Sequence, residues 1–149
     1  MAAVETRTHS SVHVLKGAVS KVLGARVTTS VRVEGNGGRL TVQCDRKPSV
    51  DEVVRIESEA NGLIARNGEL IQFEMERGEA EGHFGKAMYD QFPIPAHVVL
   101  LKIVRIPDWE VNCCAEPHVD SAGAVGRLSV DGTRFRKAKG LLEITFHVG

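Results

Sequence analysis

Residues 9–33 read HSSVHVLKGAVSKVLGARVTTSVRV, in which a helical pattern is followed directly by a strand pattern. Apolar residues first recur at intervals of three and four, the spacing of one helix face: Val12, Leu15, Val19 and Val22. Thr8 is placed to cap this pattern and Gly24 ends it, so a helix is predicted over 9–23. The alternation that follows over 27–33 predicts a strand.

The rest of the chain reads as short strands and one further long helix. A glycine-rich turn at 35–38 joins the first strand to a returning strand over 39–44, and the two form a hairpin. The capping box Ser49–Glu52 opens a second helix, which Asn67 and Gly68 close. The remaining predicted elements are strands over 70–75, 98–106, 130–135 and 141–148 and a short helix over 79–84. We therefore expect one α+β domain over 1–149, a two-layer sandwich of a mainly antiparallel sheet with two long helices on one face.

The composition, with 42% hydrophobic and 26% charged residues, is that of a folded globular domain and not of a disordered or fibrous chain. No apolar run approaches the roughly 18 residues that a membrane-spanning helix needs, so we expect no membrane partner. The first residues lack the pattern of a signal peptide, and three cysteines do not suggest a disulfide framework. A cytoplasmic location is therefore expected.

The formal net charge is zero, but the charges are unevenly distributed. Residues 1–47 carry an excess of five positive charges, residues 51–81 an excess of six negative charges, and residues 127–139 an excess of four positive charges. This separation permits one face to bind an anionic partner, although solvated charges on an ordinary surface give the same pattern.

Two pairs of metal-ligating residue types lie far apart in the chain. His9 and His13 are four residues apart on the predicted first helix, so both imidazoles lie on one side of it and can reach one ion. Cys114 and His118 have the same spacing on a loop after a predicted buried strand. A thiolate and imidazoles suit Zn²⁺ better than Mg²⁺ or Ca²⁺, so these four residues predict a zinc site.

Together with the glycines of 123–126 and the segment KGLLEI at 139–144, these two pairs resemble the editing domain of alanyl-tRNA synthetase. The similarity is closest to its free-standing relatives, the AlaX trans-editing proteins in their short form, and it covers essentially the whole chain. It implies the two-layer α+β fold shared by threonyl- and alanyl-tRNA synthetase editing domains. It also implies that the family's zinc positions correspond here to His9, His13, Cys114 and His118.

The resemblance further implies hydrolysis, in trans, of the ester that joins a wrongly attached amino acid, chiefly serine, to alanine tRNA. A metal-bound water would be the catalytic group, and the candidate catalytic side chains are His9, His13 and Cys114. Four protein ligands close a tetrahedral zinc site, so the ion would have to expand its shell, exchange a ligand or only position the substrate. The sequence does not choose among these three roles.

Rejection of alanine requires a group that hydrogen-bonds the serine hydroxyl. The candidates for binding the substrate are small or polar residues near the two ligand pairs: Ser10, Ser11, Thr29, Asn112 and Gly123. The loop after His118 departs from the family, because Ala122 and Ala124 stand where threonine and glutamate are common.

Basic residues in the last quarter of the chain are the candidates for contact with tRNA phosphates: Arg127, Arg134, Arg136, Lys137 and Lys139. Two other classes of function fit the same residues. One is a tRNA-binding module in which zinc is structural, which would bind without turnover. The other is a metal-dependent hydrolase of small esters, which would not need the basic residues. The oligomeric state does not follow from the sequence.

Overall fold

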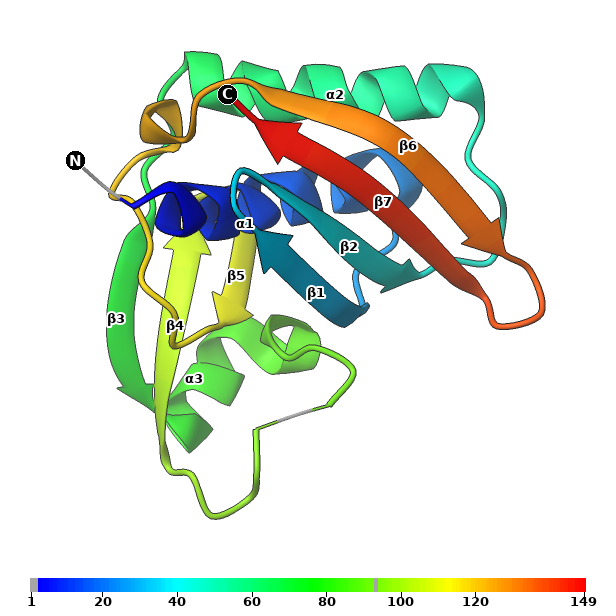
Figure 1. Cartoon of the computed structure of the whole chain (residues 1–149). Coiled ribbons are helices and arrows are strands. Elements are labelled where there is room, and N and C mark those ends of the chain that lie inside the picture. The colour runs from blue at the N-terminus through cyan, green and yellow to red at the C-terminus, as the bar shows by residue number, and fades with distance from the viewer. Residues whose placement is uncertain (1–2, 93) are drawn as a thin grey trace.

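A computed structural model describes residues 3–92 and 94–149 and confirms the α+β class (Figure 1). Met1, Ala2 and Pro93 lie outside the described residues. The helices are α1 (Val4–Leu23), α2 (Val50–Ala65) and α3 (Arg77–Phe84), with short 3₁₀ helices η1 (Gly85–Met88) and η2 (Ala122–Val125). The strands are β1 (Thr28–Glu34), β2 (Gly37–Gln43), β3 (Ile71–Glu76), β4 (Leu100–Ile106), β5 (Glu110–Cys113), β6 (Leu128–Arg136) and β7 (Leu141–Val148).

The strands divide into two antiparallel sheets. One has the order β1-β2-β7-β6 and the other the order β3-β4-β5. Every predicted strand is present, with boundaries shifted by about two residues or fewer. Strand β5 was not predicted from the sequence, because its four residues contain a single aliphatic side chain, Val111, and carry no clear alternation.

The middle of helix α1 is buried on all sides rather than on one face. Every residue from Ser10 to Val19 is buried, because α1 packs against α2, η2 and strands of both sheets. Thr8 was predicted to cap this helix, and that prediction was wrong: the helix begins a turn earlier, and Ala3 is its N-cap. The Thr8 hydroxyl instead lies within hydrogen-bonding distance of the carbonyls of Val4 and Gly35, at 2.8 and 2.7 Å.

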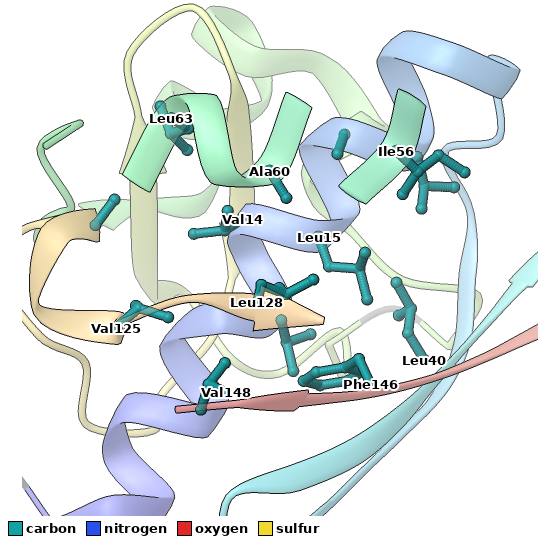
Figure 2. Packing of buried hydrophobic residues seen from close by; sticks show 14 of the residues in the cluster. Val14, Leu15, Leu40, Ile56, Ala60, Leu63, Val125, Leu128, Phe146 and Val148 are labelled. Atoms are coloured by element: carbon teal, nitrogen blue, oxygen red, sulfur yellow. The ribbon is translucent and has the colours of Figure 1, made fainter. Parts of the chain in front are cut away.

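The main core lies between α1, α2 and the inner face of the four-stranded sheet. Figure 2 shows Leu15 of α1, Ile56 of α2 and Leu40 and Phe146 of the sheet in this core, and all four are at most 1% exposed. A smaller core forms where the three-stranded sheet packs on α3 and η1: Ala80, Met88, Leu101 and Ile103. Between the two cores, α1 is fixed by surrounding elements, so polar side chains on it are held in defined positions.

The predicted capping box at the start of α2 is confirmed. The Ser49 side chain accepts from the backbone N–H of Glu52, and the Glu52 carboxylate accepts from the backbone N–H of Ser49. Among the helices of the described residues, none is both long and apolar enough to cross a membrane.

Candidate metal centre

Four metal-ligating side chains meet beside the N-terminal half of α1. His9 and His13 project from that helix, Cys114 follows β5 directly, and His118 lies on the loop after it. His9 Nε2 lies 3.1 Å from Cys114 Sγ, and His13 Nε2 lies 3.0 Å from His118 Nε2. All four ligand atoms lie within 4.8 Å of one another. The structure thus brings together the four residues that the sequence assigned to a metal.

Two further side chains orient the imidazoles from outside this group. His13 Nδ1 lies 3.0 Å from Glu110 Oε2, and His118 Nδ1 lies 3.0 Å from Gln72 Oε1. Because each Nδ1 is engaged, Nε2 is the nitrogen that each ring presents to the shared centre. Such contacts are typical of histidines that bind metals.

The charge of the cluster also suits metal binding. Burial raises the pKa of the Cys114 thiol, but hydrogen bonds with His118, His13 and His9 lower it by more, to about 3. Burial lowers the pKa of His13, but the Glu110 carboxylate and a hydrogen bond with Cys114 together raise it by more, so the net shift is upward. Cys114 is therefore a thiolate at neutral pH, which is the form of cysteine that binds metals.

The donor set fits a tetrahedral transition-metal ion. Three imidazole nitrogens and one thiolate are ligands that proteins use for such ions, and bonds of about 2.0–2.3 Å place the ligand atoms about 3–4 Å apart. The observed separations of 3.0 to 4.8 Å need only small side-chain rotations to reach that spacing. His9, His13, Cys114 and His118 could together hold one metal ion.

A groove of about 510 Å³ passes the outer side of the cluster. Thr6 and His9 of α1 form one part of its lining, Val31 and Val33 of β1 another, and Glu5, Glu116 and Pro117 complete it. His9 is the one ligand of the four that lines this groove. A molecule in the groove would therefore approach the metal centre past His9.

A second cavity, of about 270 Å³, lies further along α1. Lys16, only 8% exposed, donates hydrogen bonds to Asp90 Oδ1 and Asn112 Oδ1, each at 3.1 Å. The Asn112 amide in turn donates to the Met88 carbonyl and to Asp90. Glu110 lines the same cavity, so this cavity and the metal centre share one residue.

The predicted substrate-binding residues are not gathered around the groove. Ser10 Oγ donates to the Thr6 carbonyl and accepts from the Val119 N–H, and Ser11 Oγ donates to the Thr8 carbonyl; both serines are fully buried. Thr29 donates to the carbonyl of Thr41 across the β1–β2 hairpin.

Two other predicted substrate-binding residues lie away from the groove. Asn112 is 4% exposed and belongs to the Lys16 network. The Gly123 N–H donates to Asn67 Oδ1 at 2.8 Å, and a Cβ at this position would collide with the Asn67 amide. The close approach to Asn67 therefore accounts for the glycine.

The predicted tRNA contacts spread along β6 and its turn. Arg127 precedes the strand, while Lys137 and Lys139 lie in the turn before β7. At about 3.3 Å per residue, Arg127 and Lys137 are about 30 Å apart. Arg136 Nε lies 2.7 Å from Glu143 Oε2, which partly neutralises it. Figure 1 shows the β6–β7 turn at the opposite end of the sheet from the first turn of α1.

Sequence reasoning missed Glu110, Gln72 and Thr6. Thr6 lies three residues before His9 on the same helix, so helical spacing extended by one turn would have found it. Glu110 lies four residues before Cys114, and even spacing on a strand would have placed both on one face, had β5 been predicted. Gln72 lies on β3, two strands away from β5 in the three-stranded sheet, and no sequence pattern connects it to His118.

No protein-family model matches the chain. Comparison with curated proteins finds similarity to archaeal alanine–tRNA ligases. The chain is 32% identical to the enzyme of Methanopyrus kandleri over 145 residues, which are 97% of this chain and 16% of the ligase. It is 31% identical to that of Pyrococcus abyssi over 96% of this chain and 15% of the ligase, and 30% identical to that of Nitrosopumilus maritimus over 97% and 16%.

The chain is related to a segment of alanine–tRNA ligases. It spans about one sixth of the length of these relatives. The similarity confirms the predicted relation to alanyl-tRNA synthetase, and it covers both ligand pairs, since nearly the whole chain is matched. Assignment to the free-standing AlaX branch stays a prediction.

Proposed function

We propose that this protein is a zinc-dependent aminoacyl-tRNA deacylase that hydrolyses the ester of mischarged alanine tRNA, chiefly Ser-tRNA(Ala), in trans. The observation that carries the proposal is the cluster of three imidazoles and one thiolate beside a solvent groove. Almost the whole of the chain that carries this cluster is similar to a segment of alanine–tRNA ligases, and this similarity supports tRNA as the substrate. The sequence resemblance to AlaX proteins supports action in trans and a cytoplasmic location.

His9, His13, Cys114 and His118 would hold the ion. When bound, zinc would supply Lewis-acid polarisation of the ester carbonyl or activation of water. Glu110 and Gln72 hold the rings of His13 and His118 in place, so the ligand geometry is set before substrate binds. His9, which lines the groove, is the ligand nearest to an incoming ester.

The groove supports an aminoacyl ester as the ligand. Glu5 and Glu116 line it, and no lysine or arginine of residues 3–92 and 94–149 does so, which favours a cationic group such as the α-ammonium of the amino acid. Val31 and Val33 provide an apolar part of its lining. The terminal ribose and its phosphate would then lie outside this acidic groove.

Selection of serine over alanine requires a hydroxyl partner in the groove. Thr6 lines the groove and is half-buried, whereas the hydroxyls of Ser10 and Ser11 are engaged with the backbone. We therefore assign to Thr6 the hydrogen bond with the hydroxyl of the substrate's serine. Where the bound substrate shields the Thr6 hydroxyl from water, that hydroxyl is left unpaired when alanine enters, which lowers the binding of alanine.

The direct test is release of amino acid from Ser-tRNA(Ala) and Ala-tRNA(Ala), with metal content measured on the same preparation. We expect serine release, sparing of alanine and one zinc ion per chain. His9→Ala is expected to abolish turnover, and Thr6→Val to reduce serine release while leaving metal content unchanged. Bound zinc with neither ester cleaved would overturn the deacylase and favour a tRNA-binding module. Full activity of His9→Ala without bound metal would overturn the role of the metal centre.

A further inference from the structure

The four-stranded sheet has one face that no helix of the described residues covers. Its inner face carries the buried residues Leu40 and Ile144 and packs on α1 and α2. The opposite face, which we call the outer sheet face, carries the side chains that alternate with these. Figure 1 shows all four strands of this sheet side by side, from β1 at one edge to β6 at the other.

Four arginines lie on the outer sheet face: Arg32, Arg39, Arg134 and Arg136. Arg32 of β1 is directly opposite Arg39 of β2 in the strand register. On the far side of the sheet, Arg134 of β6 is directly opposite Glu143 of β7. Within the described part of the chain, neither Arg39 nor Arg134 forms an ion pair; Glu143, whose charge interacts with both, is hydrogen-bonded to Arg136. Arg32 has only a 3.6 Å contact with Glu34 in which both side chains are mostly exposed.

This arrangement is unfavourable for the isolated protein. Like charges directly opposite each other on neighbouring strands are destabilising, and an exposed ion pair such as Arg32–Glu34 compensates little. The phosphates of a polyanion would relieve the repulsion between Arg32 and Arg39. Arginine is well suited to this role, because its planar guanidinium binds phosphate oxygens in a bidentate manner.

The same edge strand connects this face to the groove. Val31 and Val33 of β1 line the groove beside His9, and Arg32, between them in sequence, points to the other face of the strand. Since successive residues of a strand alternate between its faces, only the thickness of one strand separates Arg32 from the groove. A polyanion that lies over Arg39 and Arg32 would reach His9 by crossing β1.

We propose that the outer sheet face, through Arg32, Arg39 and Arg134, binds the phosphate backbone of the substrate RNA, whose 3′ end crosses the edge strand β1 into the groove at His9. The inference rests on the proposed function for the identity of the RNA. It adds Arg32 and Arg39 to the tRNA contacts predicted from the sequence. It also accounts for the charges: phosphates lie on the basic face and the aminoacyl group in the acidic groove.

The test measures binding of an uncharged acceptor-stem RNA with a single-stranded 3′ tail as a function of salt concentration. Each phosphate contact contributes about 0.7–0.9 to the slope of log K against log salt, so Arg39→Ala and Arg32→Ala should each lower that slope by about 1. Arg39→Lys keeps the charge and should retain most of the slope. Arg55→Ala, at an exposed arginine on α2, is the matched control and should leave it unchanged.

Unchanged salt slopes in Arg32→Ala, Arg39→Ala and Arg134→Ala would overturn the proposal. A decrease of the slope in Arg55→Ala as large as in these variants would also overturn it. The urea midpoint of each variant shows whether it is folded. Because this RNA carries no ester, the result is independent of deacylation. A wild-type protein that binds RNA through these arginines but cleaves no ester would sustain this inference and refute the proposed function.

Discussion

The Nδ1 atom of His13 lies 3.0 Å from Oε2 of Glu110, and both side chains are largely removed from solvent, at 1% and 13% exposure. His13 belongs to α1 and Glu110 opens β5, so this contact joins the central helix to the smaller sheet. Its position behind an imidazole of the proposed metal site makes Glu110 a candidate positioning residue for that site.

Glu110→Gln should weaken metal binding. The amide retains a hydrogen-bonding group but loses the negative charge that makes the imidazole a stronger ligand, and such changes cost about 10–100-fold in metal affinity. Competition with a chelator of known affinity measures this. Glu74→Gln, at an exposed glutamate of β3, is the control. Equal zinc affinities in the two variants would show that Glu110 does not act through His13.

Lys16→Met should destabilise the fold without removing the metal. The substitution keeps the apolar stem of Lys16 but leaves the buried Asn112 Oδ1 without its donor, which costs about 1–3 kcal/mol. Asp90 contributes little to this loss, because its side chain is 40% exposed and can be solvated. Urea unfolding measures the change, with the exposed Lys86→Met as control. The two variants should unfold at clearly different urea concentrations.

Gly17→Ala should lower stability by about 1–3 kcal/mol through overpacking. A Cβ on Gly17 would collide with the indole of Trp109, whose Nε1 is fixed by a 2.9 Å hydrogen bond to the Val14 carbonyl. Gly132→Ala, where nothing lies within 4 Å of the added Cβ, is the matched control and should be close to neutral. Thermal unfolding with calorimetry compares them; a neutral Gly17→Ala would mean that Trp109 can move.

The start of α2 should lose stability in acid. A hydrogen bond from Arg46, followed by one from the Ser49 backbone, lowers the pKa of Glu52 from 4.5 to about 2. A depressed pKa means that the stabilisation is complete above pH 4.5 and is lost as the pH falls toward about 2. Urea midpoints measured across this window should fall more steeply for the wild type than for Glu52→Gln. If the urea midpoints of the wild type and of Glu52→Gln fell in parallel with pH, the loss of stability in acid would not come from Glu52.

The sequence predicted most elements because each carries a local signal. The capping box at Ser49 and the glycine stop at Gly24 were confirmed. Thr8 was misassigned because capping depends on where the helix starts, and α1 extends back to Val4. Strand β5 was missed because a strand of four residues is stabilised by its pairing with β4, and its own sequence shows no alternation.

Single-sequence patterns predicted the four candidate metal ligands because His9 and His13 share one side of a helix, and Cys114 and His118 have a spacing at which two residues of a loop can bind one ion. That the two pairs meet depends on the tertiary structure, since α1 lies against β5 only in the folded chain. The tertiary structure likewise decided that Glu110 and Gln72 orient the imidazoles, that Ser10 and Ser11 bond to the backbone, and that Arg32 faces Arg39. The physical reason is range: residue type and spacing determine local conformation and chemical capacity, whereas contacts between distant segments depend on how the cores pack and on which strands pair.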